Sequence, residues 1–469
     1  MERLVRLLLL PPRLCIDVVL STGQGWGSGT AEYSSFESPL DAITKRAAND
    51  STAVEHVLSD TDYPRISAAA AKYADATCIV FVSADSGEGY ISAEGNRGDR
   101  KDLKLWHDGD KLILTVAANC RDTLVVVHAV GPVEMDGWVL HPNVTGVLLA
   151  HLPGQEAGSS LAAVLWGDVN PSGKLVYTIA RSLADYGPGA QLIVRPNYPA
   201  PQQDFDEGVY TDYRYFDKHG IVPRFEFGFG LSYTTFAFEN LTIVTAATPS
   251  EFPPPRPAED AAVAPELRLN STLPTPEAML FPKNLRRVPN FIYPYLESTS
   301  STTNAAGGEP PQPHTRSAVA VEALFDTLIH VTVQVRNTGR VPGKAVAQLY
   351  LSFPRNSTTN QTSTSSSSTN STSSNSNSTS TGTGNIVDFP VRVLRGFEKV
   401  GVGVSESVEV GFDLTRRDLS YWDEAAGNWR LPVDAAGVWG GYTLLVAGSS
   451  RDRTGAVQGV SPRIRIRGG

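Results

Sequence analysis

Between Ile66 and Thr178 the chain alternates short, fully apolar runs with segments of helical periodicity. The runs "TCIVFV", "TLVVVHAV" and "VTGVLLA" have the length and the β-branched content of buried strands. Helical patterns occur in "ISAAAAKYA", "LILTVAANC" and "EAGSSLAAVLWG". Apolar strands that alternate with helices predict an α/β sandwich, in which helices cover both faces of a mostly parallel sheet.

The second half of the chain has a different pattern, with apolar and polar positions alternating at period two. This alternation is present in "HVTVQV", "AVAQLYL", "SVEVGFDL" and "GGYTLLVAG", and "NTGR" supplies a turn between the first two. Period-two strands separated by turns predict an all-β antiparallel sandwich of the immunoglobulin or fibronectin type.

Two changes in composition interrupt this second sandwich. Residues 246–316 are rich in proline, and residues 356–385 contain only Asn, Gln, Ser, Thr and Gly. The second insert has no apolar side chain to bury, so we expect it to be disordered or glycosylated. The domains expected are an N-terminal remnant (1–24), the α/β sandwich (25–190), an aromatic-rich linker (191–229) and a fibronectin type III-like sandwich with both inserts (230–467).

Charge and hydropathy exclude some classes of partner. The net charge of −9 argues against nucleic acid or an anionic membrane, because both require clustered cations. No apolar stretch approaches the roughly 18 residues that span a bilayer. The opening "MERLVRLLLLPPRLCIDVVL" has the cations of a signal peptide but only four leucines before Pro-Pro. We interpret it as a poor signal or as a start placed inside a longer gene.

The cysteines and the glycosylation motifs bear on the compartment. Cys15, Cys78 and Cys120 form no disulfide framework and no CxxC pair, and we interpret Cys78 and Cys120 as buried thiols beside apolar runs. Asn-x-Ser/Thr motifs favour secretion weakly. The candidate glycosylation sites are Asn49, Asn143, Asn240, Asn270, Asn356, Asn360, Asn370 and Asn377.

The loop "SADSGEGY" at 83–90 places Glu88 between two glycines, directly after a predicted strand. A phosphate cradle is disfavoured because the loop lacks a GK[ST] motif and carries Asp85 and Glu88. A metal site could use these two carboxylates with Asp99, although nothing in the spacing requires it. A general acid fits a carboxyl group that glycines leave open to substrate. A plain turn residue also accounts for the spacing, so the residues alone leave these interpretations open.

Two similar loops, "HAVGP" and "HLPGQEAG", follow the other predicted strands. The carboxyl ends of parallel strands meet at one edge of a sheet, where ligands bind. We therefore expect the loop at 83–90 to be exposed on the same edge as these two loops. Asp99 and Arg100 are expected to form an ion pair that fixes this region.

Nine blocks resemble fungal family 3 β-glucosidases and occur in the family's order, over about Gly25 to Asp452. They are "GWGSGT", "SADSGEGY", "GNRGDR", "LKLWHDGDKLI", "HLPGQEAG", "LWGDVNPSGKLVYTI", "FDEGVYTDYRYFDKHGIVPRFEFGFGLSYTTF", "LRGFEKV" and "TRRDLSYWD". In that family an α/β sandwich and a fibronectin-like domain follow an N-terminal (β/α)8 barrel. The resemblance implies that Glu88 is the acid/base and that Tyr90 contacts the sugar on the leaving-group side. Trp26 is a further candidate to border the sugar site, although packing in the core explains it more simply.

The resemblance also implies a missing partner for Glu88. Retaining glycosidases need a second carboxylate about 5 Å from the acid, and in this family it is an aspartate on the barrel. A barrel takes about 250 residues, whereas 24 precede Gly25. The chain therefore resembles the carboxyl-terminal part of the enzyme, and we expect it to be inactive alone.

The expected function is hydrolysis of terminal non-reducing β-D-glucosyl residues of cellobiose and short β-glucans, with retention of configuration, by a secreted, extracellular enzyme. The alternative is a catalytically inactive carbohydrate-binding remnant. A cell-surface adhesion module is disfavoured, since adhesion needs no loop like that of Glu88. The resemblance implies no cofactor and no metal. The expected partners are β-glucoside oligosaccharides, with neither nucleic acid nor membrane, and a homodimer is left open.

Overall fold

The computed structural model describes residues 7–10, 23, 25, 31, 33–88, 92–93, 96–190, 204–255, 277, 280–283, 286, 295, 321–354, 387–434 and 436–466. The chain divides into two compact units. Unit 1 comprises 1–244, 331–412 and 441–461, and unit 2 comprises 245–330, 413–440 and 462–469. Each unit is described by itself.

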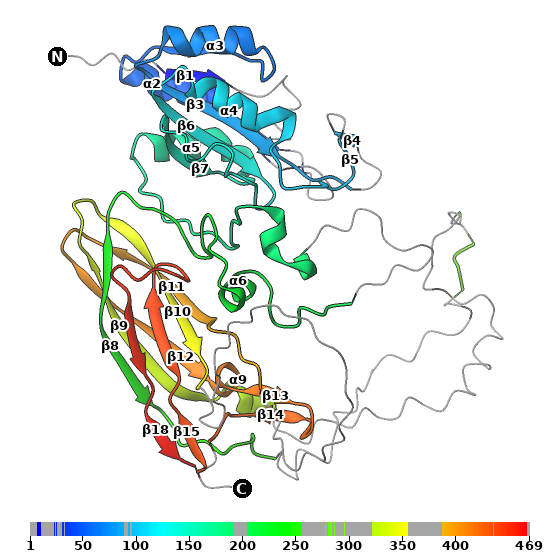
Figure 1. The fold of residues 1–469 in the computed structure, drawn as a ribbon, viewed down its shortest axis with the longest axis vertical. Helices are drawn as coiled ribbons and strands as arrows, with labels where there is room; N and C mark the ends of the chain where they lie inside the picture. The colour runs from blue at the N-terminus through cyan, green and yellow to red at the C-terminus, as the bar shows by residue number, and fades with distance from the viewer. Residues whose placement is uncertain are drawn as a thin grey trace, which may run out of the picture. The chain divides into compact units, whose positions relative to one another are not determined.

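A five-stranded parallel sheet forms the first part of unit 1, in the order β2-β1-β3-β6-β7 (Figure 1). The strands are β1 (Leu7–Leu10), β2 (Val54–His56), β3 (Thr77–Ala84), β6 (Asp122–Ala129) and β7 (Val144–Leu149). The three apolar runs predicted as strands are confirmed as β3, β6 and β7. Strand β1 was not predicted, because it falls in the segment that the sequence pattern assigned to an N-terminal remnant.

Helices cover both faces of this sheet, as the pattern predicted. They are α2 (Pro39–Asn49), α3 (Tyr63–Lys72), α4 (Gly109–Ala117) and α5 (Ala157–Leu165). Successive side chains of a strand point to opposite faces. One core therefore joins Val80 and Val82 of β3 with α3 and α4, through Ile66 and Ile113. The other joins Ile79 and Phe81 of β3 with α2 and α5, through Ile43 and Leu161.

Local sequence explains where two of these helices begin. Pro39 occupies the first turn of α2, and the Ser38 hydroxyl accepts a hydrogen bond from the Asp41 N–H at 3.1 Å. Asp62 caps α3 by accepting from the Arg65 N–H at 3.3 Å. Such side-chain acceptors satisfy N–H groups that have no partner within the helix.

The cysteine interpretation was wrong for Cys78 and Cys120, which form a disulfide. Cys78 lies on β3 and Cys120 lies just before β6, and both are fully buried. Because β3 and β6 are neighbours in register, with Cys78 opposite Thr123, the two Cα atoms approach to 6.5 Å. A separation of 42 residues hides this proximity in the sequence. Cys15 lies outside the described residues.

The fibronectin-like sandwich contains two sheets, as predicted. One is antiparallel and has the order β11 (Val393–Val402), β10 (Gly343–Ser352), β16 (Thr443–Ala447) and β17 (Val457–Val460). The other has the order β12 (Ser407–Thr415), β9 (Thr327–Asn337) and β8 (Phe236–Thr245). On β9 the alternating Val331, Val333 and Val335 are buried. The "NTGR" turn leads from β9 to β10 in the other sheet rather than closing a hairpin.

Within unit 1 the aromatic-rich segment joins the α/β part to the antiparallel sheet through α6 (Tyr213–His219). The Tyr213 hydroxyl accepts a hydrogen bond from the Leu394 N–H at 2.9 Å. The buried Asp217 carboxylate pairs with Arg392 at 3.1 Å and with Arg451 at 3.0 Å. These contacts hold the segment against the antiparallel sheet.

Unit 2 contains short elements. They are η8 (Val321–Phe325), α9 (Arg416–Leu419), β13 (Tyr421–Asp423), β14 (Asn428–Arg430), β15 (Val438–Gly440) and β18 (Arg463–Arg465). Strands β13 and β14 form a hairpin, and Arg430 on it bonds to Glu251 at 2.7 Å and to Asp423 at 2.8 Å. In the described part of the chain, no helix combines the length and the apolar character needed to cross a membrane.

Candidate functional site

The order of the strands marks one edge of the parallel sheet as the place for a ligand. From β1 the chain moves outward to β2, whereas from β3 it moves the other way to β6 and β7. The direction therefore reverses between β1 and β3. In open α/β sheets, ligands bind outside the carboxyl ends of the strands at such a reversal. The loop that carries Glu88 begins at the carboxyl end of β3.

Main-chain hydrogen bonds hold the two residues that precede Glu88 in the loop after β3. The Ser86 N–H donates to the Gly25 carbonyl at 3.2 Å, and the Gly87 N–H donates to the Gly98 carbonyl at 3.1 Å. Asp85 is fully buried, whereas Glu88 is half-buried. The loop was expected to be exposed; among its described residues Ser86 and Glu88 are partly exposed, whereas Ser83 to Asp85 and Gly87 are buried.

Gly25 shows that the three loops share an edge, which confirms the expectation. Its φ of +68° suits glycine. A Cβ atom built on it would lie 2.7 Å from Leu152 in "HLPGQEAG" and 2.7 Å from Val130 in "HAVGP". The Val130 N–H also donates to the Ala84 carbonyl at 3.2 Å. The loops that follow β3, β6 and β7 therefore converge on this glycine.

Asp99 and Arg100 bond to other groups instead of forming the expected ion pair. The Ser86 hydroxyl donates to Asp99 Oδ1 at 3.1 Å and accepts from the Arg100 N–H at 3.1 Å. The Arg100 guanidinium donates through Nη2 to the Pro132 carbonyl, in the loop after β6. Burial holds the pKa of Arg100 below its ordinary value.

Two histidines at this edge were not singled out from the sequence. His128, near the end of β6, is 1% exposed and stacks on Phe81 with ring centroids 6.3 Å apart. Neither ring nitrogen of His128 has a hydrogen-bond partner among the described residues. Burial, with a smaller contribution from His151, lowers the pKa of His128 to about 4.

His151 begins the loop after β7 and has a positive φ of 52°. Its Nδ1 lies 3.5 Å from the Tyr177 hydroxyl, and the two rings meet edge to face. Burial raises the pKa of Tyr177 to about 12, so the phenol stays protonated at neutral pH. In the sequence, the available signal was that each histidine comes directly before a glycine- and proline-containing loop after a strand.

The metal interpretation of this edge used the carboxylates of Asp85, Glu88 and Asp99. Among the residues that it describes, no group of three or more His, Cys, Asp or Glu side chains lies close enough to hold a metal ion. Of the three carboxylates considered, Asp99 accepts a hydrogen bond from Ser86, and Asp85 is fully buried.

Several candidate residues lie outside the described residues. These are Trp26, Tyr90, Asn270, Asn356, Asn360, Asn370 and Asn377, with the whole insert at 356–385. Of the other glycosylation candidates, Asn49 and Asn240 are exposed. Asn143 is half-buried, and its side-chain amide donates to the Ala117 carbonyl at 2.7 Å.

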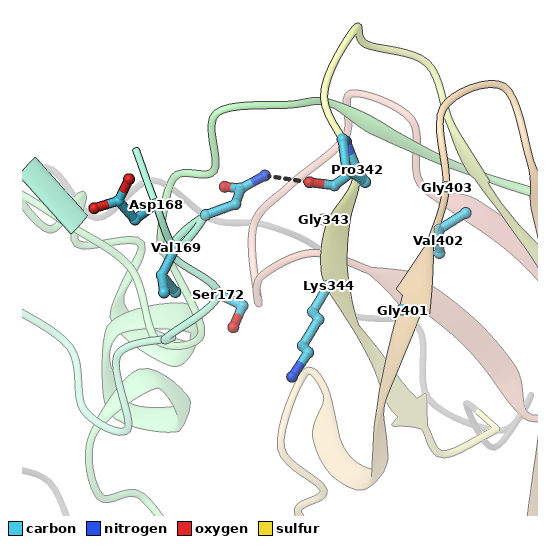
Figure 2. Close-up of a pocket in the computed structure, with 10 residues that line it drawn as sticks. Asp168, Val169, Ser172, Pro342, Gly343, Lys344, Gly401, Val402 and Gly403 are labelled. Atoms are coloured by element: carbon cyan, nitrogen blue, oxygen red, sulfur yellow. Dashed lines mark hydrogen bonds between the residues drawn. The ribbon is translucent and has the colours of Figure 1, made fainter. Parts of the chain in front are cut away.

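A cavity of about 400 Å³ lies elsewhere in unit 1 (Figure 2). Its lining comes from the segment after α5 and from the facing ends of β10 and β11, where the Asn170 amide donates to the Pro342 carbonyl at 3.0 Å. None of the residues that line it belongs to the loop that carries Glu88. No aromatic side chain lines it, and we assign it no role.

Comparison with known families gives matches to two parts of the chain. Residues 17–233 match the glycosyl hydrolase family 3 C-terminal domain, and residues 380–450 match the fibronectin type III-like domain. The chain is 43% identical over 456 residues to a probable beta-glucosidase E of Neosartorya fischeri and to one of Aspergillus fumigatus. These alignments cover 94% of this chain, but 42% and 39% of the two relatives. The chain thus spans about two fifths of the length of these relatives.

Solved structures give the same result. A family 3 beta-glucosidase from Neurospora crassa superimposes with a TM-score of 0.73 at 32% identity, covering 98% of this chain and 53% of that one. A beta-glucosidase from Chaetomium thermophilum gives a TM-score of 0.73 at 30% identity, covering 98% and 54%. The α/β sheet and the β-sandwich described above are therefore the architecture that these homologues share with this chain.

Proposed function

This chain belongs to glycosyl hydrolase family 3 by its C-terminal and fibronectin type III-like domains, and on that premise we propose that it supplies the acid/base of a retaining β-glucosidase. The proposed acid/base is Glu88. The proposed substrates are cellobiose and short β-glucans, cleaved at their terminal non-reducing β-D-glucosyl residues. The observation that carries the proposal is the position of Glu88, half-buried at the carboxyl end of β3, beside the reversal of strand order.

The proposed chemistry has two steps. In the first, the Glu88 carboxyl group gives its proton to the glycosidic oxygen, so that the leaving group departs as a neutral alcohol while a nucleophilic carboxylate bonds to the anomeric carbon. In the second, the Glu88 carboxylate takes a proton from water, whose oxygen bonds to the same carbon as the bond to the nucleophilic carboxylate breaks, and β-glucose is released. The fixed main chain around Ser86 and Gly87 supports this role, because a general acid acts only when it is within hydrogen-bond reach of the departing oxygen.

The second carboxylate, which acts as the nucleophile, is proposed and does not belong to the site described above. The described residues form an open five-stranded sheet, a β-sandwich and short elements, and none of them belongs to an eight-stranded parallel barrel. The resemblance places the nucleophile on such a barrel. We therefore expect the 469 residues alone to hydrolyse aryl β-glucosides at or near background.

A catalytically inactive carbohydrate-binding protein is the second candidate. It is favoured because Glu88 is the one catalytic carboxylate proposed among the described residues, and one carboxylate cannot complete a double displacement. The two candidates differ in a measurable way. A binding protein would give a calorimetric signal with cello-oligosaccharides when the 469-residue chain is used alone, whereas a half-site without its glucose pocket would give none.

Secretion and N-glycosylation are also proposed. A disulfide such as Cys78–Cys120 persists in oxidising compartments and is rare in the cytosol. Asn49 and Asn240 are exposed, so glycans there would project into solvent. Secretion is tested by mass spectrometry of protein recovered from culture medium. Glycans and an intact disulfide would agree with it, whereas protein retained in cells with free thiols would contradict it.

The catalytic proposal is tested with the whole chain joined downstream of a family 3 barrel, called here the fused protein. Glu88→Gln should slow hydrolysis of aryl glucosides with poor leaving groups by about 10² to 10⁴-fold, the usual contribution of a general acid. Activated aryl glucosides should lose less, because their leaving groups need no proton. Equal losses for both substrates, or no loss, would contradict Glu88 as the acid.

A further inference from the structure

One arginine connects the loop that carries Glu88 to the next loop along the same edge. The Arg100 N–H donates to the Ser86 hydroxyl at 3.1 Å, two residues before Glu88. Through its guanidinium, the same residue donates to the Pro132 carbonyl in the loop after β6. Main chain and side chain of Arg100 therefore bond to two different loops.

Ser86 forms hydrogen bonds through both its hydroxyl group and its main-chain N–H. The Ser86 hydroxyl accepts from Arg100 and donates to Asp99, while its N–H donates to the Gly25 carbonyl. The neighbouring Gly87 N–H donates to the Gly98 carbonyl at 3.1 Å. The segment 98–100 thus borders the main chain just before Glu88 and fixes its direction. Both residues that precede Glu88 are therefore hydrogen-bonded to the segment 98–100.

The environment of Arg100 is unusual for a residue with only a structural role on a surface. Arg100 is half-buried, and no carboxylate accepts from its guanidinium in the described residues. Burial disfavours the charge of the Arg100 guanidinium, and the nearby Asp102 carboxylate offsets this in part. The neighbours of Arg100 include Tyr177, which itself meets His151 of the loop after β7. Arg100 therefore lies where the segments from all three loops come together.

We propose that Arg100 and Ser86 are positioning residues for Glu88: together they lock the loop that carries the acid/base onto the loop after β6. This rests on the proposed function, because a positioned acid matters only if Glu88 donates a proton. The substrate does not touch either residue in this account. Their effect is to hold the carboxyl group at the place where the glycosidic oxygen arrives.

The first test uses the whole 469-residue chain and amide hydrogen exchange at residues 85–88. Ser86→Ala removes two hydrogen bonds and leaves the Arg100 N–H without an acceptor, so exchange should rise on the order of tenfold. Ser86→Thr keeps the hydroxyl and should restore the slow rate. The control is Arg46→Ala, which removes ion pairs to Asp50 and Asp168 at the far ends of α2 and α5 and should leave exchange at 85–88 unchanged.

The second test uses Arg100→Met and the fused protein. Arg100→Met removes the hydrogen bond from the guanidinium to the Pro132 carbonyl and keeps the Arg100 main-chain N–H. If Arg100 positions Glu88, amide exchange rises at residues 85–88 and not only near Pro132. The rate then falls more for poor leaving groups than for activated ones. Faster exchange confined to residues 130–134, or equal losses for all substrates, would overturn the proposal.

The two proposals fail in different ways. If Glu88→Gln leaves turnover unchanged, the proposed function is wrong whatever Arg100 does. If Glu88→Gln is impaired but Ser86→Ala and Arg46→Ala give the same exchange rates at 85–88, the function stands and the positioning role is wrong.

Discussion

His128 should make the α/β part of the chain sensitive to acid. The imidazole is 1% exposed, neither of its nitrogens has a hydrogen-bond partner among the described residues, and burial lowers its pKa from 6.5 to about 4. The folded protein therefore keeps His128 neutral down to about pH 4, whereas the unfolded chain binds a proton below about pH 6.5. The stability from this group is complete above pH 6.5, falls as the pH drops below 6.5, and is fully lost once the pH has fallen through 4.

The size of the effect follows from the shift. A pKa difference of about 2.5 units corresponds to about 3 kcal/mol when the titration is complete. Between pH 7 and pH 5 the loss is about 2 kcal/mol, because the unfolded chain is then mostly protonated and the folded protein is not. Such a loss corresponds to roughly 20-fold weaker protection of the core amides at pH 5.

His128→Leu isolates this contribution. Leucine has no group to protonate, and its apolar side chain leaves no unpaired nitrogen in the core. The assay is hydrogen exchange of the buried amides of β6, corrected for the intrinsic effect of pH. Wild-type protein should lose about 20-fold more protection than His128→Leu between pH 7 and pH 5. His56→Leu, at an exposed position of β2, is the control and should behave as wild type. An equal loss in wild type and His128→Leu would refute the reasoning.

The remaining predictions concern the covalent link and the glycine at the edge of the sheet. Replacing Cys78 and Cys120 together by alanine should destabilise the α/β part by about 4 kcal/mol, which is the chain-entropy value for a loop of 42 residues. The loss should appear as a lower melting temperature, and an unchanged melting temperature would show that the disulfide is not formed. Gly25→Ala should cost at least about 2 kcal/mol, since it combines a positive φ with contacts of 2.7 Å to Leu152 and Val130. Gly131→Ala in the loop after β6 is its control, because a Cβ there meets nothing within 4 Å; similar denaturation midpoints for both variants would contradict the close approach at Gly25.

Much of the fold was predictable because its signals are local. The strands β3, β6 and β7 are apolar runs of strand length, and the helices between them have a clear apolar face. Strand order could not be read in the same way. Strand β1 lies in a segment whose leucines resemble a truncated signal peptide, yet it forms the centre of the reversal that defines the candidate site.

The parts of the site that were missed depend on contacts between segments distant in the sequence. Cys78 and Cys120 become neighbours only when β3 and β6 pair. Arg100 was expected to pair with its sequence neighbour Asp99, but a carbonyl 32 positions away accepts from its guanidinium. By contrast, the convergence of the three loops was predictable, because parallel strands place their carboxyl ends at one edge whatever their order.

The most direct test of the central claim is the product that azide forms with Glu88→Gln in the fused protein. If Glu88 is the acid/base, this variant accumulates the glycosyl-enzyme from an activated aryl glucoside, since no base activates water. Azide, which needs no base, should then attack the anomeric carbon and restore turnover, giving β-glucosyl azide by nuclear magnetic resonance. Wild-type fused protein should gain nothing from azide. Full turnover of Glu88→Gln without azide, or an azide product of α configuration, would contradict the account.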